Sequence, residues 1–427
     1  MLAARFLRKT TTSRSYQHAL SVITLMLALM LTVHASAQNP RPLWLFEANG
    51  GNIDGGNPFG TVVFDNKGNL FGTTQTQDFD GNGMVYELTP TAQGLWKEAI
   101  IHEFSASGAD GAKSDATLLR DSSGNLFGTT LYGGDMACGF GCGVVFELSP
   151  QSNGQWQYTV IHRFAGGADG GHPVAGVIED ALGNLYGTTT GDGLDNVGTV
   201  YELSPTAMGF NETVLHEFGG DDGVAPYAPL AFDAQGNLYG TALLGGELNL
   251  GTVYKLNKQS DGTWQVSVLH SFQGGSDGQN PLAGVTLDRR GGVFGASQSP
   301  SGALPCGTLF VLNPAKNYAE TILHEFEGTF HNNDGCDPNQ PVFDSHGNLF
   351  ATTEFGGTDN AGTIFELSRT SSGLNYRILH SFVGDQLNST DGEFPFTPMV
   401  FGPNGALFST SLGPNFPAGG EVFEFIP

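Results

Sequence analysis

The segment Gly68-Asn69-Leu70-Phe71-Gly72-Thr73-Thr74 recurs along the chain and decides its fold. Three close copies (GNLFGTT, GNLYGTT and GNLYGTA) and three weaker copies (GGVFGAS, GNLFATT and GALFSTS) follow it, beginning at Gly124, Gly183, Gly236, Gly291, Gly347 and Gly405. Successive copies start 53 to 59 residues apart. A fixed period of this length is typical of repeat architectures, in which each copy is one supersecondary unit.

Each period contains four segments with the pattern of short strands. An apolar run ends at an Asp such as Asp65, a turn containing Gly follows, and the repeated core forms the second segment. The third segment resembles Met84–Leu88 and the fourth resembles Thr213–Phe218. We expect the Asp to accept hydrogen bonds from the turn backbone. Four strands in each of seven copies predict an all-β, seven-bladed β-propeller of four-stranded blades.

The two ends of the chain predict how the ring closes. Leu43-Trp44-Leu45-Phe46 has the fourth-strand pattern of Leu215-His216-Glu217-Phe218 but precedes the first copy of the core. The last copy contains a second and a third strand (Glu421–Phe425) and then stops. We therefore expect the N-terminal strand to complete the last blade, which leaves no unpaired sheet edge there.

The first 37 residues have the composition of a signal peptide. Residues 1–18 are basic and contain no acid, an apolar run extends from Ala19 to Val33, and Ala35-Ser36-Ala37 is an A-x-A cleavage site. We expect cleavage after Ala37, a single propeller domain over residues 38–427, and a secreted or periplasmic protein. The apolar run is shorter than a spanning helix requires, so we expect no membrane span after cleavage.

The charge of the chain excludes one class of partner. The sequence has 17 Lys and Arg residues against 42 Asp and Glu residues, and its formal net charge is −25. Without the four basic residues of the first 37, the charge is −29. A nucleic-acid partner is therefore not expected, because phosphate binding requires a basic patch. We expect a monomer.

The repeat pattern L-H-x-F…D-G-x-x-P…G-N-L-Y-G-T-T…G-T-V-Y-E-L resembles the GloVer (Gloeo_Verruco) tandem repeat of exported bacterial proteins. The resemblance extends over residues 43–427. It implies a secreted or surface location and a propeller-like fold, and it implies no particular enzymatic activity.

Histidine occupies one fourth-strand position in six copies, and Trp occupies it in the seventh. These residues are His102, His162, His216, His270, His324, His380 and Trp44. A packing position is used in every blade, whereas a catalytic centre is normally built once. We therefore interpret this position as structural, and the sequence singles out no catalytic residue.

An Asp-Gly pair follows each fourth strand. The aspartates are Asp54, Asp110, Asp169, Asp222, Asp277, Asp334 and Asp391. Asp-Gly is common turn chemistry, so a structural role in the crossover loop is one interpretation. The other is a ring of carboxylates that binds a ligand or Ca²⁺ through hard oxygen ligands. No other cofactor is expected, and the sequence identifies no further metal site.

The four cysteines suit an oxidising compartment. Cys138 and Cys142 lie in one loop of the second copy, while Cys306 and Cys336 lie in loops that emerge on the same face of the propeller. We predict two disulfides, Cys138–Cys142 and Cys306–Cys336.

Apart from a purely structural surface component, two classes of function remain after these observations. The first is an exported non-catalytic scaffold or binding module, whose variable loops bind a ligand, a glycan or a surface protein. The alternative is an extracellular polysaccharide lyase or hydrolase that uses carboxylates on the loop-rich face. For an enzyme, the non-repeat histidines His172, His331 and His346 and the irregular segment 304–341 would be candidates.

Overall fold

The computed structural model describes residues 39–47, 55–76, 81–105, 107–191, 197–299, 306–328, 333–384, 391–413 and 419–427. Asn39–Pro427 is one compact unit. The predicted signal peptide, Asp54 and His331 lie outside the described residues.

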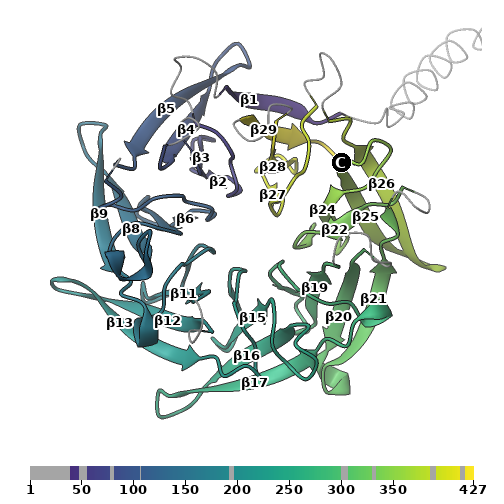
Figure 1. The fold of residues 1–427 in the computed structure, drawn as a ribbon. Coiled ribbons are helices and arrows are strands. Elements are labelled where there is room, and N and C mark those ends of the chain that lie inside the picture. The colour runs from purple at the N-terminus through teal and green to yellow at the C-terminus, as the bar shows by residue number, and fades with distance from the viewer. Residues whose placement is uncertain are drawn as a thin grey trace, which may run out of the picture. The chain divides into compact units, whose positions relative to one another are not determined.

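The described residues form seven antiparallel sheets arranged in a ring (Figure 1), so the predicted seven-bladed propeller is confirmed. The innermost strands are β2 (Val63–Phe64), β6 (Leu119–Arg120), β10 (Ile178–Glu179), β14 (Ala231–Phe232), β18 (Thr286–Leu287), β23 (Val342–Phe343) and β27 (Val400–Phe401). The second strands, which contain the repeated core, are β3 (Leu70–Thr74), β7 (Leu126–Thr130), β11 (Leu185–Thr189), β15 (Leu238–Ala242), β19 (Val293–Ser297), β24 (Leu349–Phe355) and β28 (Leu407–Ser411).

The two outer strands of each blade are longer. The third strands are β4 (Met84–Pro90), β8 (Val144–Pro150), β12 (Thr199–Thr206), β16 (Thr252–Lys258), β20 (Thr308–Asn313), β25 (Thr363–Thr370) and β29 (Gly419–Phe425). The fourth strands are β5 (Trp96–Glu103), β9 (Trp156–Arg163), β13 (Gly209–Glu217), β17 (Trp264–Ser271), β21 (Ala319–Glu325), β26 (Gly373–Ser381) and β1 (Arg41–Glu47).

Short elements lie in the connections. Four 3₁₀ turns are described: η1 (Met136–Cys138), η2 (Gly167–Asp169), η3 (Gly275–Asp277) and η4 (Pro314–Lys316). An extra strand that the sequence did not predict, β22 (Cys336–Pro338), pairs with β24 in the sixth blade.

Because the strands are antiparallel, their connections divide between two faces of the ring. We call one the loop face; it carries the loops between second and third strands and the crossovers to the next blade. The other, the turn face, carries the turns between first and second strands and between third and fourth strands. The aspartates of these first turns behave as predicted: Asp180 Oδ1 accepts from the backbone N–H groups of Leu182 and Asn184 at 2.8 and 3.0 Å.

The seventh blade is assembled from both ends of the chain, as predicted. β1 pairs antiparallel with β29, with Trp44 opposite Val422 and Phe46 opposite Gly420. Arg41 Nε donates to Glu424 Oε2 at 3.0 Å across 383 residues of sequence. The blade order β1-β29-β28-β27 therefore closes the ring.

One aromatic pair recurs at all seven interfaces between blades. A Phe just after or at the end of each fourth strand contacts a Tyr or Phe on the third strand of the next blade, with ring centroids 4.9 to 5.6 Å apart. Phe104 with Phe146 and Phe218 with Tyr254 are examples, and all four rings are buried. The core therefore consists of the contacts between blades as well as those within each sheet.

The aromatic side chain on the third strand explains why the repeated core contains a glycine. A Cβ at Gly187 would lie 2.3 Å from the hydroxyl of Tyr201 on the neighbouring strand. Opposite Phe365, in the sixth blade, the glycine is replaced by Ala351, which is fully buried. The core motif therefore keeps a small residue wherever the third-strand ring lies across the second strand.

Candidate functional site

Each repeat histidine is placed by an irregularity in its strand. In the third blade Val200 pairs with His216 and Tyr201 pairs with Val214. Leu215, between the two paired residues, is therefore the extra residue of a β-bulge. The same shift precedes every repeat histidine and Trp44. A bulge of this kind redirects the next side chain, here toward the crossover loop.

The structure brings each described repeat histidine together with the aspartate of the following Asp-Gly pair. The repeat pattern alone did not predict this pairing. Nε2 of the histidine lies 2.8 to 3.2 Å from the carboxylate in five interfaces: His102–Asp110, His216–Asp222, His270–Asp277, His324–Asp334 and His380–Asp391. In the remaining described pair, His162 and Asp169, the separation is 3.5 Å.

The aspartate also fixes the crossover loop. Asp110 Oδ1 accepts from the backbone N–H of Ser105 at 2.9 Å, and Asp222 Oδ1 accepts from that of Gly219 at 2.7 Å. Burial raises the pKa of Asp110, but the hydrogen bonds from Ser105 outweigh burial and leave the pKa below its ordinary value. Burial lowers the pKa of His102, against the opposing effect of Asp110. Calcium binding by these aspartates stays a prediction.

A third position, on the fourth strand of the next blade, faces each pair and varies. Tyr158 and Tyr376 stack flat on His102 and His324, with centroids 3.7 and 3.9 Å apart, and donate to the backbone carbonyls of Asp110 and Asp334. Strand register places Val266, Glu212 and Glu320 at the same position in three other interfaces. The histidine environment therefore differs from blade to blade.

Two interfaces combine the His–Asp pair with a glutamate. His162 Nε2 lies 3.5 Å from Glu212 Oε2, and His270 Nε2 lies 3.6 Å from Glu320 Oε1. Burial, together with the adjacent aspartate, raises the pKa of each glutamate to about 9. The repeat pattern did not predict these two clusters, because the fourth-strand position that holds Glu212 and Glu320 varies from copy to copy.

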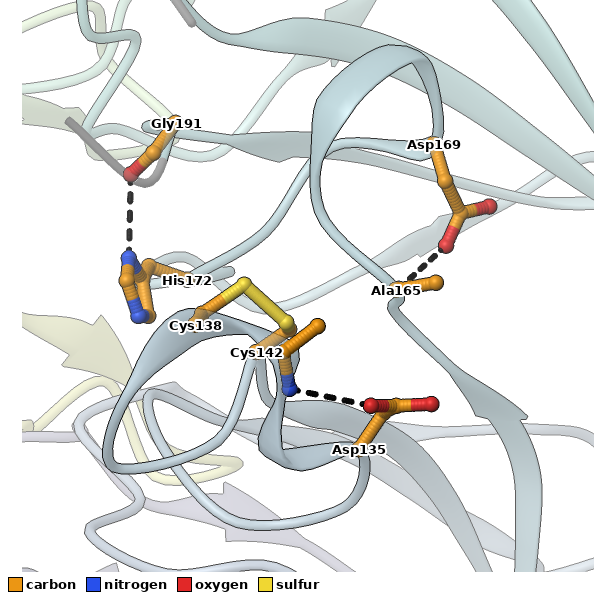
Figure 2. Close-up of a disulfide and its surroundings, with 8 residues drawn as sticks. Asp135, Cys138, Cys142, Ala165, Asp169, His172 and Gly191 are labelled. Carbon is orange, nitrogen blue, oxygen red and sulfur yellow. Dashed lines mark hydrogen bonds between the residues drawn. A yellow bond between two sulfur atoms is a disulfide. The ribbon is translucent and has the colours of Figure 1, made fainter. Parts of the chain in front are cut away.

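The predicted disulfide Cys138–Cys142 is confirmed (Figure 2). It closes the loop between β7 and β8, beside the crossover that carries Asp169 and His172. The backbone N–H of His172 donates to Cys142 O at 2.8 Å, and its Nδ1 lies 3.0 Å from Gly191 O. These contacts anchor His172 to the β7–β8 loop and to Gly191 on the loop face.

The second predicted disulfide is not formed. Cys306 and Cys336 are free thiols whose side chains contact each other, as the loop geometry predicted, and each sulfur also lies near a backbone carbonyl. Cys336 Sγ is 3.5 Å from Cys306 O, and Cys306 Sγ is 3.8 Å from Gly335 O.

Two acids near these thiols have raised pKa values. Burial raises the pKa of Asp337 to about 6, and burial together with Asp337 raises that of Glu354 to about 8. Asp337 lies in the irregular crossover into the sixth blade and adopts a left-handed backbone conformation with φ of 55°, while Glu354 lies on β24. The pair is the carboxylate arrangement on the loop face most relevant to an enzyme.

A hollow of about 700 Å³ opens on the turn face between the fifth and sixth blades. Its floor is apolar and includes Phe294 and Phe343, whose rings meet edge to face at 5.0 Å. Its rim carries three arginines, Arg289, Arg290 and Arg369. All three side chains are exposed, and none has an ion pair or hydrogen bond among the described residues.

The hollow exists because one side chain is smaller than its repeat equivalents. At other interfaces an aromatic residue near the start of the fourth strand covers the second-strand ring of the preceding blade, as in Phe71–Trp156 and Phe127–Phe210. In the sixth blade the position holds Leu374, which is 44% exposed and pairs with Arg369. A leucine cannot cover the area that an indole covers, so the site stays open and Arg369 borders it.

The fold and these sites define a seven-bladed β-propeller whose interfaces carry polar clusters and one cationic hollow. The Gloeobacter/Verrucomicrobia repeat matches residues 139–329 and 259–427, and the chain belongs to that family. The resemblance noted in the sequence is thereby confirmed. A search of functionally curated proteins found no significant match.

Solved structures similar to this chain are other propellers with low sequence identity. A protein from Lactobacillus plantarum has a TM-score of 0.52 and 16% identity, over 82% of this chain and 89% of its own. Two candidate 6-phosphogluconolactonases are also similar. The Bacteroides fragilis protein has a TM-score of 0.48 and 12% identity over 79% and 85% of the two chains. The Bacteroides uniformis protein has a TM-score of 0.49 and 12% identity over 80% and 96%. At these identities the likeness concerns the fold alone.

The described part of the chain contains no helix long and apolar enough to cross a membrane.

Proposed function

We propose that this protein is an exported, non-catalytic binding module that takes an acidic glycan into the arginine-lined hollow between the fifth and sixth blades. The observation that carries the proposal is the concentration of positive charge there. Seven arginines follow residue 37 in a strongly acidic chain, and three of them line this one hollow.

The chemistry of the hollow selects the ligand class. Guanidinium groups bind carboxylate and sulfate oxygens in bidentate fashion. The two aspartates at the rim, Asp288 and Asp344, accept from the backbone N–H groups of Arg290 and His346, so their oxygens are partly engaged. The apolar floor suits the C–H face of a sugar ring, and the volume lies within the usual range for ligand sites. An anionic oligosaccharide presents both features.

The test is isothermal titration of the purified protein with oligogalacturonate, chondroitin sulfate and cello-oligosaccharides. We expect binding of an acidic glycan that weakens as salt increases, no binding of the neutral one, and no new reducing or unsaturated ends on long incubation. Binding of the neutral glycan alone, or of none of the three, would contradict the proposal.

Two variants test the location of binding. Leu374→Trp restores the aromatic residue that other blades hold at this position and should abolish binding while the fold is kept. Arg289→Gln with Arg290→Gln should weaken binding at least tenfold. Arg377→Gln is the matched control. Arg377 is exposed on β26, the strand that carries Leu374, but its guanidinium is paired with Glu366 at 2.7 Å. It should bind as the parent protein does.

Glycan cleavage by carboxylates of the loop face is the second candidate, because Asp337 and Glu354 combine burial, proximity and raised pKa values. A raised pKa near the working pH is what a general acid requires. This alternative predicts release of new ends from a polysaccharide by the parent protein and loss of that release, at least a hundredfold, in Glu354→Gln.

A further inference from the structure

The two interfaces that contain a glutamate present a set of donor atoms that the other interfaces lack. One set is His162, Asp169 and Glu212, between the second and third blades; the other is His270, Asp277 and Glu320, between the fourth and fifth. In each set one histidine nitrogen and two carboxylate oxygens lie within 4.8 Å of one another. The same arrangement is therefore built twice, from corresponding positions of different blades.

The separations suit a small divalent ion. Three ligands at zinc–nitrogen and zinc–oxygen distances, in tetrahedral arrangement, lie about 3.3 to 3.5 Å apart. His162 Nε2 lies 3.5 Å from both carboxylates of its set, and His270 Nε2 lies 3.2 and 3.6 Å from those of its own. Where the third residue is Tyr or Val, the histidine and aspartate are closer, in a direct hydrogen bond at 2.8 to 3.1 Å, whereas the His270–Asp277 bond is 3.2 Å long.

Buried ligand atoms in both sets have no hydrogen-bonding partner among the described residues. They are Nε2 of His162, Oε1 of Glu212 and Oε1 of Glu320. An unsatisfied buried polar atom costs free energy. Each glutamate also lies against the aspartate of its set, and this hydrogen-bonding arrangement requires the glutamate to keep its proton. The other interfaces meet the same histidine with a stacked tyrosine ring or an apolar side chain, which avoids this cost.

We propose that these two interfaces each bind one divalent ion of the zinc class, through the His–Asp–Glu sets of residues 162, 169 and 212 and of residues 270, 277 and 320. The imidazole nitrogen favours zinc and similar borderline metals over Ca²⁺ and Mg²⁺, which prefer all-oxygen sites. Each ion joins two blades, because the histidine and aspartate come from one blade and its crossover and the glutamate comes from the next. The side chains are 11 to 25% exposed, so an ion and a water ligand can reach them.

The test measures zinc itself, by equilibrium dialysis of the full protein against low micromolar free Zn²⁺ followed by elemental analysis. The parent protein should hold two zinc ions per chain. Glu212→Tyr and Glu320→Tyr should each hold one, and the double variant should hold none. Tyrosine is the matched replacement, since the chain already carries it at this position in two blades. Glu212→Gln and Glu320→Gln, which change the shape least, should show the same losses.

His346→Gln controls for binding by an exposed histidine on the turn face and should retain two ions. Zinc should also raise the thermal midpoint of the parent protein but not that of the double variant, because binding to the folded state alone stabilises it. The proposal is overturned if no zinc is retained, if the tyrosine variants retain two ions, or if millimolar Ca²⁺ displaces the zinc.

Discussion

Glu421 shows how much one side chain can depend on its place in the ring. It lies on β29, next to the strand that closes the propeller, and is 1% exposed. Its Oε1 accepts from Ser411 Oγ at 3.0 Å and from the backbone N–H of Gly392 at 3.1 Å. Threonine holds the equivalent position in several other blades. In the third blade, for example, the hydroxyl oxygens of Thr199 and Thr189 lie 2.9 Å apart. Burial raises the pKa of Glu421 to about 8.

The raised pKa makes stability depend on pH. The unfolded carboxyl titrates near 4.5 and the folded one near 8, so the folded state binds more protons in that window and loses stability as pH rises through it. Glu421→Gln should be more stable than the parent at pH 8, by an order of a few kcal/mol, and the gain should shrink toward pH 5. Urea unfolding at the two pH values measures this. An equal difference at both would refute the assignment, and exposed Glu103→Gln is the control.

At the scale of the element, the aromatic side chain of the third strand determines which residue the repeated second strand can hold at its glycine position. The hydroxyl of Tyr201 is buried without a hydrogen-bonding partner among the described residues, and it occupies the space that a Cβ at Gly187 would need. Gly295 lies opposite Phe310, which has no hydroxyl, and the nearest ring atom would be 2.6 Å from a new Cβ. Gly187 therefore has less room for a Cβ than Gly295, although Gly128 opposite Phe146 is nearly as crowded as Gly187, at 2.4 Å.

We expect Gly187→Ala to lower the free energy of unfolding by about 1–3 kcal/mol, the usual cost of overpacking a core. Gly295→Ala should cost less, since Ala351 is accommodated opposite Phe365 in the sixth blade. Chemical denaturation of both variants measures the difference. Tyr201→Phe should rescue part of the loss at Gly187, and additive effects in the double variant would show that the hydroxyl is not the cause.

The elements that the sequence predicted are those that repeat. The core strand, the aspartate turn and the position of the histidine recur in nearly every copy, so their structural roles could be inferred from period and alternation. Leu374 and Glu212 could not be recognised in this way, because each matters through the side chain that it meets in the preceding blade. The Cys306–Cys336 prediction placed the two residues together correctly, but in the structure they are adjacent free thiols and not a disulfide.

At the scale of the whole molecule, the propeller depends on β1. Phe46 and Leu43 are buried in the cluster between the seventh and first blades, and β1 covers the edge of β29. Removing residues 39–47 should lower the free energy of unfolding by at least about 3 kcal/mol, the cost of losing one buried aromatic side chain. The exposed edge should also make the protein associate.

Light scattering coupled to size-exclusion chromatography measures that association. A synthetic peptide of residues 39–47 added in trans should bind the truncated protein and restore the monomer, whereas a peptide with Phe46→Asp should not. A truncated protein that stays monomeric and equally stable would show that β1 is dispensable.

The pairing of Arg41 with Glu424 also orders events in time. β1 is synthesised before all other strands of the propeller, and its pairing partner Glu424 on β29 follows Arg41 by 383 residues. Six blades can therefore form before β1 finds its partner, and the unfinished seventh sheet keeps an open edge until β29 has been made. The entropic cost of closing a loop grows only with the logarithm of its length. The long separation of β1 and β29 therefore matters more through the delay in pairing than through the free energy of closure. A nascent chain of this protein is most exposed to aggregation just before β29 emerges.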